Sequence, residues 1–420
     1  MTQGAEIICV GTELLLGEIL NSNAQFLAQE LAKLGIPHFF QTVVGDNPVR
    51  IKQAIALACQ RSSIFIFTGG LGPTPDDLTT EAIADFFETP LVEDAAVWAI
   101  IEQKFTVRGI VPSPSNRKQA LRPEGAQPLP NPTGTAPGIV WQPRPGLTLL
   151  TFPGVPRELY PMWNQTAIPF LKSQGWGETQ IFSRNLRFWG IPESTLAEKV
   201  APFLQQKSPT VAPYAGRGEA RLRLSVRSNS QVEADQALDS LQQKIQALCG
   251  QDYYGSDADT LAAVVGRLLV GRSQTVSVAE SCTGGGLGQK LTDSPGSSGY
   301  FWGGVIAYDN RVKLRLLNVD ANILETHGAV SAAVAQQMAI GVKNLLGTSW
   351  GISITGIAGP GGGSKDKPVG LVYIGLAAPD GTLTHQEHYF GIGRGRDWIR
   401  DVSASHALDL IRRQLLRCGF

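Results

Sequence analysis

The stretch Thr275-Val276-Ser277-Val278-Ala279-Glu280-Ser281-Cys282-Thr283-Gly284-Gly285-Gly286 decides the architecture of the C-terminal part of the chain. Residues 275–279 predict a strand, and the three glycines predict a tight turn that opens a helix. Backbone N–H groups at such a turn favour an anion or a developing oxyanion. Ser281 is therefore either a nucleophile or the cap of the following helix, and this stretch alone leaves both interpretations open.

Short apolar runs alternate with amphipathic helical patterns in the N-terminal part as well. Residues 7–10, 64–67 and 147–152 predict buried strands, and Asn21 or Ser22 is the expected cap of a helix. Strands that alternate with helices form a parallel sheet, whose ligand crevice lies at the carboxyl ends of the strands. The sequence therefore predicts an α/β fold.

The length of 420 residues exceeds one ordinary hydrophobic core and predicts several domains. We expect α/β domains over residues 1–174 and 257–420. Between them, residues 175–256 contain the alternation of a half-exposed strand and then an amphipathic helix, which predicts a small α+β module acting as a spacer or in dimerisation. Further elements expected in the C-terminal domain are a helix over 260–269 capped by Asp259, strands over 304–308 and 351–355, a hairpin at Asp380-Gly381 and a helix over 397–416.

The composition describes a neutral globular protein. The 36 basic residues balance the 36 acidic ones, so direct nucleic-acid binding is not expected. No apolar stretch approaches the roughly 18 residues of a membrane span, and no secretory signal is recognised at the N-terminus. The cysteines form no C-x-x-C pair, which suits a reducing cytoplasm rather than disulfides or a cysteine zinc site. The five cysteines are Cys9, Cys59, Cys249, Cys282 and Cys418.

Two residues later in the chain, Tyr308 and Lys313, are candidates for activating Ser281. Tyr308 ends a predicted strand, and Lys313 follows in the first turns of the next helix. A serine needs a base to remove its proton, and a lysine serves as that base only when burial or a nearby charge lowers its pKa. Tyr308 would relay the proton or orient the lysine in a Ser-Lys variant of nucleophilic catalysis. In the alternative interpretation Lys313 is solvated and Tyr308 belongs to the core, and spacing does not decide between the two.

A third polar element lies near the C-terminus. Thr355 ends a predicted strand and is followed by a glycine-rich loop over residues 356–363, which is typical of a phosphate or oxyanion cradle or of a plain flexible connection. Arg394, Arg396 and Arg400 are bidentate donors for a ligand phosphate or, alternatively, surface charges.

Polar and glycine-rich turns also follow two N-terminal strands. Gly11 and Glu13 follow the first strand, and residues 68–77 follow another. Because both turns belong at strand carboxyl ends, their side chains should converge on one crevice. Glycine N–H groups there suit a pyrophosphate. Hard oxygen donors for Mg²⁺, which would assist attack of water on a phosphoanhydride, are Glu13, Asp46, Asp76 and Asp77. In the alternative, Asp76 and Asp77 are turn residues that cap the helix after Leu78.

The C-terminal motifs resemble those of the CinA family of competence- and damage-inducible proteins. The matching motifs are residues 279–285, 304–313 and 355–360, in the family's order and separation. The resemblance implies a nicotinamide-nucleotide amidase that converts nicotinamide mononucleotide to nicotinic acid mononucleotide and ammonia without a cofactor. It implies Ser281 rather than Cys282 as the nucleophile, activated by Tyr308 and Lys313. The substrate-binding residues that it implies are Thr283, Gly284, Gly285, Thr355, Gly356, Arg396 and Arg400.

One departure from the family pattern affects the phosphate site. The family has a compact Phe-x-Gly-Asp-Arg element, whereas residues 390–396 of this chain are two residues longer and lack the acidic residue. Alignment from the final helix makes Arg396 and Arg400 the counterparts, with Arg394 as the alternative.

Residues 5–170 resemble the molybdopterin-binding fold of CinA N-terminal domains, on the two turns and on residues 131–138 and 153–158. The resemblance implies a metal-dependent ADP-ribose pyrophosphatase or a relic binding site. The middle module resembles the KH-like segment of the family but has no G-x-x-G loop of the kind that clamps RNA. The implied nucleotide site is formed by Gly11, Glu13, Gly69, Gly70, Gly72 and Thr135, with Asp46, Asp76 and Asp77 as metal ligands.

Together these features predict a cytoplasmic hydrolase with two sites for small nucleotides, nicotinamide mononucleotide and ADP-ribose, working as a homodimer without membrane association. The alternative is a nucleotide-binding regulatory protein of competence or DNA repair with weak or no catalysis. Intact Ser281, Tyr308 and Lys313 argue against a purely binding role.

Overall fold

The computed structural model describes residues 4–177, 179–216, 218–391 and 393–417, so Cys418 lies outside the described residues. The chain forms two compact units, one of residues 1–182 with 227–235 and one of residues 183–226 with 236–420. Among the described residues, no helix combines the length and the apolar composition that a membrane span requires.

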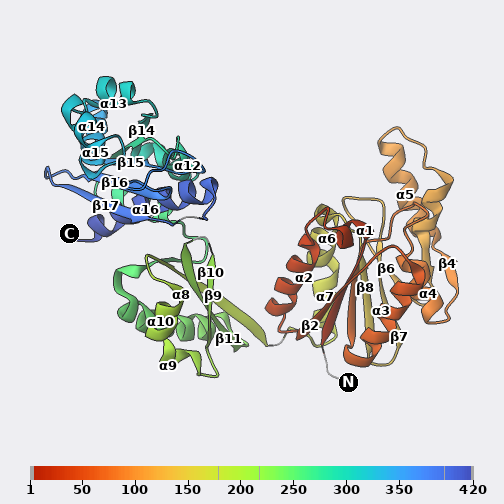
Figure 1. The fold of residues 1–420 in the computed structure, drawn as a ribbon. Coiled ribbons are helices and arrows are strands. Elements are labelled where there is room, and N and C mark those ends of the chain that lie inside the picture. The colour runs from red at the N-terminus through yellow and green to blue at the C-terminus, as the bar shows by residue number, and fades with distance from the viewer. Residues whose placement is uncertain (1–3, 178, 217, 392, 418–420) are drawn as a thin grey trace. The chain divides into compact units, whose positions relative to one another are not determined.

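The N-terminal domain is built on a six-stranded sheet with the order β2-β1-β3-β8-β7-β6 (Figure 1). The four strands from β2 to β8 are parallel, which confirms the predicted parallel sheet, and β7 and β6 continue it as antiparallel strands. The elements of this domain are β1 (Ala5–Val10), α1 (Thr12–Leu16), α2 (Ser22–Lys33), β2 (His38–Val44), α3 (Pro48–Arg61), β3 (Ile64–Thr68), α4 (Thr79–Phe86), β4 (Leu91–Glu93), α5 (Ala95–Val107), η1 (Pro114–Ala120), β5 (Leu121–Pro123), β6 (Gln127–Leu129), β7 (Gly138–Arg144), β8 (Leu147–Phe152), α6 (Pro156–Met162), η2 (Trp163–Ala167) and α7 (Ile168–Ser173).

Both faces of this sheet are covered, as expected for parallel strands. Alternate residues of β1 enter two separate cores. Ile7 and Cys9 pack with residues of α2, α6 and α7, whereas Ile8 and Val10 pack with residues of α3 and α4. With both faces buried, only the strand ends and their loops are available to a ligand.

Helix α2 begins at the first of its two candidate caps. The Oδ1 atom of Asn21 accepts a hydrogen bond from the N–H of Ala24 at 3.1 Å, so Ser22 is the first residue inside the helix. The alternative that Asp76 and Asp77 cap α4 is wrong, because Leu78 holds the cap position and no side chain bonds there.

The middle module is a four-stranded sheet with the order β10-β11-β9-β12. Along β11, Leu222 and Leu224 are buried while Arg221 and Arg223 are exposed, which is the predicted alternation of a half-exposed strand. Its elements are β9 (Gln180–Trp189), α8 (Glu193–Lys199), α9 (Ala201–Leu204), β10 (Thr210–Gly216), β11 (Glu219–Ser228), α10 (Gln231–Cys249), η3 (Gly250–Asp252) and β12 (Tyr253–Ser256).

The C-terminal domain has a five-stranded sheet with the order β14-β13-β15-β16-β17. Strands β14, β13 and β15 are parallel, and the hairpin predicted at Asp380-Gly381 joins the antiparallel β16 and β17. Its elements are α11 (Leu261–Val270), β13 (Val276–Glu280), α12 (Gly286–Thr292), η4 (Ser297–Gly299), β14 (Phe301–Ile306), α13 (Asn310–Leu317), α14 (Ala321–His327), α15 (Ala332–Leu346), β15 (Trp350–Gly356), β16 (Leu371–Ala377), β17 (Leu383–Tyr389) and α16 (Arg396–Arg417).

Two local predictions in this domain are wrong. Thr260, not Asp259, caps α11 by accepting the N–H of Ala263 at 3.1 Å, while the Asp259 carboxylate accepts the N–H of Ser256. Strand β14 ends at Ile306, so Tyr308 lies in the loop after the strand. The cap is displaced by one residue, and the strand begins three residues and ends two residues earlier than predicted, since the boundaries of elements are the part of a fold that sequence patterns define least well.

Candidate functional site

Ser281 directly follows β13, where the strand gives way to the glycine-rich turn. Its N–H donates to the carbonyl of Ile354 at 2.9 Å, which holds the backbone against β15. Alternate residues face opposite sides here: Ala279 packs in the core beneath α13 and α15, whereas Cys282 packs with α11, α12 and α16. Ser281 therefore faces the side of the sheet that carries Lys313 on α13.

Lys313 is buried, with 1% of its surface exposed. Its Nζ lies 3.5 Å from Oγ of Ser281 and donates to the carbonyls of Ala307 at 2.7 Å and Tyr308 at 3.3 Å. Burial lowers the pKa of the lysine, partly opposed by the nearby Asp309 carboxylate. A neutral amine has two N–H donors and one lone pair. Because two carbonyls take the donors, the lone pair is left for the serine hydroxyl.

Cys282, the neighbour of Ser281, packs in the hydrophobic core on the other face of the sheet. Its thiol is buried, and burial raises its pKa to about 12. A thiol with such a pKa remains protonated at neutral pH and is a poor nucleophile. The geometry therefore favours Ser281 over Cys282.

Glu280 caps α12, a role that sequence reasoning missed. Its carboxylate is 1% exposed. It accepts the N–H groups of Gly285 at 3.0 Å, Leu287 at 3.0 Å and Gly288 at 2.8 Å. The helix N-terminus is thus filled by the protein's own anion. Ser281 does not cap the helix, and this terminus does not offer its donors to a substrate.

Two other N–H groups of the turn are available instead. Among the described residues, neither the N–H of Cys282 nor that of Thr283 donates to a backbone carbonyl. They directly follow the candidate nucleophile, which is where an oxyanion hole needs donors. The left-handed φ angles of Gly284 and Gly285, 59° and 98°, allow the turn that presents them.

The three arginines have different surroundings. Arg396 donates to the carbonyl of Gly359 at 2.8 Å and to the hydroxyl of Tyr308 at 3.4 Å. Arg400 donates to the carbonyl of Thr283 at 2.8 Å and so supports the turn. Arg394 lies over the ring of Trp398 instead. Arg396 is therefore the arginine that shares the open side of the site with the Tyr308 ring, which is 63% exposed.

The remaining predicted substrate residues are more deeply placed. Thr355 is buried, and its hydroxyl donates to the carbonyl of Ala329 at 2.7 Å. A Cβ on Gly356 would come within 2.8 Å of the Leu371 carbonyl oxygen, so this glycine permits close strand packing. Thr283 is fully buried, and its hydroxyl has no partner among the described residues. It lines a separate cavity between α12 and α16.

The N-terminal residues predicted to form a nucleotide site converge as expected. A cleft of about 440 Å³ opens at the carboxyl ends of the parallel strands. All nine predicted residues line it: Gly11, Glu13, Asp46, Gly69, Gly70, Gly72, Asp76, Asp77 and Thr135.

This cleft is rich in hydrogen-bond acceptors. Five carboxylates line it, with Glu158 added to the four predicted ones, and no lysine, arginine or histidine is among its described lining residues. Asp46 accepts the N–H and hydroxyl of Thr12 at 2.9 and 2.8 Å, and Asp77 accepts the N–H of Thr74 at 2.9 Å. Among the described residues no three carboxylate, histidine or cysteine side chains gather as a metal site. The donor type suits Mg²⁺, but the donors are not assembled around one point.

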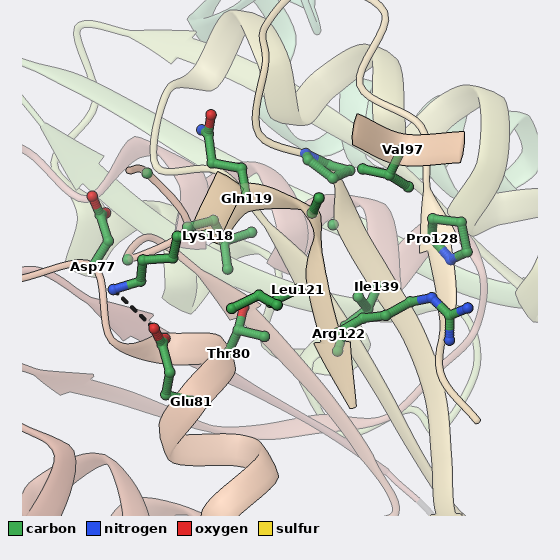
Figure 2. A pocket seen from close by; sticks show the side chains of 16 residues that line it. Asp77, Thr80, Glu81, Val97, Lys118, Gln119, Leu121, Arg122, Pro128 and Ile139 are labelled. Carbon is green, nitrogen blue, oxygen red and sulfur yellow. Dashed lines mark ion pairs between the residues drawn. The ribbon is translucent and has the colours of Figure 1, made fainter. Parts of the chain in front are cut away.

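A small second cavity lies behind the glycine loop of this cleft (Figure 2). Its volume of about 20 Å³ holds one water rather than a ligand. Lys118 of η1 forms an ion pair with Glu81 of α4 at 2.9 Å and reaches the carbonyl of Thr74, as Figure 2 shows for the pair. These contacts support the loop that carries Asp77 from behind.

Comparison with known proteins covers the whole chain. Three family models match: the probable molybdopterin binding domain over residues 6–173, the damage-inducible protein CinA KH domain over residues 183–255 and the CinA C-terminal domain over residues 258–415. A solved structure, the competence/damage inducible protein CihA from Agrobacterium tumefaciens, is 37% identical over 38% of this chain and 97% of that one, with a TM-score of 0.35.

Curated relatives match over the full length. A CinA-like protein from Cyanothece sp. is 66% identical over 100% of both chains. Another from Nostoc punctiforme is 64% identical over 98% of this chain and 99% of its own. Because these relatives match the chain over its full length at 64–66% identity and three family models match its domains, the chain belongs to the CinA family.

Proposed function

We propose that the C-terminal domain is an amidase that converts nicotinamide mononucleotide to nicotinic acid mononucleotide and ammonia. The observation that carries this proposal is the 3.5 Å separation between Oγ of Ser281 and Nζ of the buried Lys313. A hydroxyl beside an amine of lowered pKa is the arrangement that Ser-Lys nucleophilic catalysis needs. The substrate comes from the family resemblance of the motifs around these residues.

The proposed reaction needs only groups of the chain and water. Neutral Lys313 takes the hydroxyl proton as Oγ of Ser281 bonds to the amide carbon. The N–H groups of Cys282 and Thr283 stabilise the oxyanion of the tetrahedral intermediate. The Lys313 ammonium then protonates the amide nitrogen, the C–N bond breaks and ammonia leaves. Water, deprotonated by the same lysine, hydrolyses the acyl ester and regenerates Ser281.

Arg396 and Tyr308 are proposed to hold the substrate. The guanidinium of Arg396 and the hydroxyl of Tyr308 already share a 3.4 Å hydrogen bond on the open side of the site. A guanidinium binds phosphate oxygens in bidentate fashion, and an exposed aromatic ring offers a face to the pyridine. In this assignment Tyr308 orients Lys313 through its carbonyl, while its hydroxyl serves the substrate.

The test is release of ammonia by the purified full-length chain from nicotinamide mononucleotide, with and without a chelator. We expect release under both conditions, loss of activity by at least roughly a thousandfold in Ser281→Ala, and retention in Cys282→Ala. Full activity in the serine variant would disprove the nucleophile assignment. Binding of the nucleotide without any product would instead favour the alternative, a regulatory nucleotide-binding protein of competence or DNA repair.

The N-terminal cleft is proposed as a second site, for a nucleotide pyrophosphate such as ADP-ribose. What favours it is the convergence of two glycine turns and Thr135 on one cleft of about 440 Å³. Since five carboxylates line this cleft, a pyrophosphate would need a cation bound to its own oxygens. Isothermal titration with ADP-ribose, with and without Mg²⁺, tests binding, and AMP release tests turnover.

The cellular setting is likewise a proposal. Cys9, Cys59, Cys249 and Cys282 are free thiols, which fits a reducing cytoplasm. The homodimer expected from the sequence would give about twice the mass of one chain in light scattering, and a single-chain mass at micromolar concentration would contradict it.

A further inference from the structure

Asn23, in the first turn of α2, lies at the floor of the N-terminal cleft. It is 7% exposed and lines the cleft beside the glycine turn after β3. The sequence motifs gave Asn23 no role in ligand binding, because an asparagine near the start of a helix is usually interpreted as a capping residue. The cap here is Asn21, so the side chain of Asn23 has another role.

The orientation of the Asn23 amide is fixed by its neighbours. Its Nδ2 donates to Oγ1 of Thr68 at 2.9 Å and to the carbonyl of Gly154 at 2.7 Å. The Thr68 hydroxyl gives its own proton to the carbonyl of Pro153 at 3.1 Å, so it can only accept from Asn23. A rotated amide would place its oxygen against the Gly154 carbonyl. Both amide protons are thereby used within the protein.

The opposite end of the amide has no such partner. The Oδ1 atom of Asn23 is buried and accepts no hydrogen bond from any described residue. Buried acceptors in native structures are normally satisfied, by the protein, by water or by a ligand. The carboxylates that line the same cleft supply no donors of their own.

The chemistry of the missing partner follows from these acceptors. Phosphate oxygens are acceptors and would be repelled by Oδ1 and by the carboxylates. A sugar hydroxyl donates to such an oxygen and tolerates neighbouring carboxylates. We propose that Oδ1 of Asn23 accepts a hydrogen bond from a ribose hydroxyl of the nucleotide bound in the N-terminal cleft, and that this contact selects ribose-bearing ligands. The inference rests on the nucleotide site proposed above.

The experiment is isothermal titration of the full-length chain with three probes: ADP-ribose, ribose 5-phosphate and inorganic pyrophosphate, each with Mg²⁺. In Asn23→Ala we expect affinity for ADP-ribose and ribose 5-phosphate to fall roughly tenfold or more, with pyrophosphate unchanged. The melting temperature of Asn23→Ala and its retained affinity for pyrophosphate show whether this variant is folded. A second measurement needs no variant: the wild-type chain should prefer ribose 5-phosphate to methyl phosphate, which has no sugar hydroxyl, and equal affinities would contradict the proposed contact.

Asn164→Ala is the control. Asn164 lies exposed on η2 of the same domain and does not line the cleft, so its replacement should leave the affinity for all three probes unchanged. Equal affinity of wild type and Asn23→Ala for ADP-ribose would overturn the inference about Asn23 but would leave the proposed nucleotide site in place. An equal loss for pyrophosphate would assign the donor to metal-bound water and also overturn it. A wild-type chain that binds none of the probes would overturn both the inference and the proposed site.

Discussion

A lysine acts as a base near neutral pH only when its uncharged form is favoured, and Lys313 meets this condition through burial. The two carbonyls around Nζ accept hydrogen bonds from either the ammonium or the amine, so they orient the group without forcing it to carry charge. The exposed Lys244 on α10 has no such surroundings and provides a comparison. This difference in environment yields a prediction about pH.

Amidase activity should rise with pH along a limb that lies below the ordinary lysine pKa of 10.5, because burial lowers the pKa of Lys313 and only the neutral amine accepts the serine proton. Lys313→Met should lower kcat by roughly a thousandfold or more, and Lys313→Arg should not restore it, since guanidinium does not deprotonate. The pH profile of kcat checks this, with Lys244→Met as the control. An unchanged profile in Lys313→Met would remove the lysine from the mechanism.

Substitution of the two arginines in the first turns of α16, Arg396 and Arg400, should affect different kinetic constants. Arg396 contacts the Tyr308 hydroxyl on the open side of the site, whereas Arg400 holds the Thr283 carbonyl. Arg396→Ala is therefore expected mainly to raise KM for nicotinamide mononucleotide, by roughly tenfold or more, and Arg400→Ala mainly to lower kcat. Steady-state kinetics measure both. The reverse pattern would exchange their roles.

The sequence motifs could predict which residues belong to the candidate site. They could not predict which of these residues contact one another. Ser281 and Lys313 lie 32 positions apart, and only the fold brings them within 3.5 Å. The choice between Arg394 and Arg396 depended on which one begins α16. The structure places Arg396 at the start of that helix and Arg394 over Trp398.

At the scale of the element, the turn between β13 and α12 depends on a buried carboxylate. Glu280 accepts three N–H groups, so removing its charge leaves helix donors unpaired and loosens the turn that carries Ser281. A glutamate at a strand end carries no sequence signal for this role. The alternation of the strand predicts only that it faces away from Ser281.

Glu280→Gln should lower kcat by roughly tenfold to a hundredfold, because the amide NH₂ group of glutamine would face backbone N–H groups whose hydrogen bonds the carboxylate accepts in the wild type. The rise of kcat with pH that we assign to Lys313 should stay at the same pH. Kinetics across pH test this. Asp320→Asn is the matched control, because Asp320 caps α14 by accepting two N–H groups in the same domain. Wild-type activity in Glu280→Gln would show that the turn holds its shape without the charge.

At the scale of the whole molecule, the order of strands and helices could be predicted well and the polar network only in part. Apolar runs identified β1, β3 and β8, since strands buried on both faces are mostly apolar, whereas β13 has the sequence Val-Ser-Val-Ala-Glu and was identified together with the glycine turn that follows it. The antiparallel β7 and β6 were missed because both contain a proline, which is unusual inside a sheet, and β6 is only three residues long. Asn23, Glu158 and Gln119 enter the N-terminal cleft from elements far apart in the chain, so no local pattern marks them.

The second unit should lose stability in acid through His406. Burial, together with His388 and Arg413, lowers the pKa of His406 to about 3, and the indole N–H of Trp189 donates to its ring at 3.5 Å. A folded-state pKa below the unfolded value of 6.5 means that the unfolded chain binds the proton first. The stability contributed by neutral His406 is therefore present above pH 6.5 and lost as the pH falls toward 3.

Calorimetry of wild type and His406→Phe between pH 7 and 4 measures this effect. The melting temperature of the variant should fall less steeply with acid than that of the wild type. His385→Phe is the control, because His385 lies exposed on β17. Parallel slopes for all three proteins would mean that His406 is protonated in the folded state without cost.

The buried thiol of Cys282, next to Ser281, affects how the protein should respond to oxidants. Peroxide attacks thiolates that solvent can reach, and Cys282 is neither ionised nor exposed. Hydrolases that depend on a reactive cysteine stop when that sulfur is oxidised. If the proposed Ser281 nucleophile is correct, the attacking atom is an alcohol oxygen and the neighbouring sulfur is buried in the core, so amidase activity is expected to survive treatment of the protein with hydrogen peroxide.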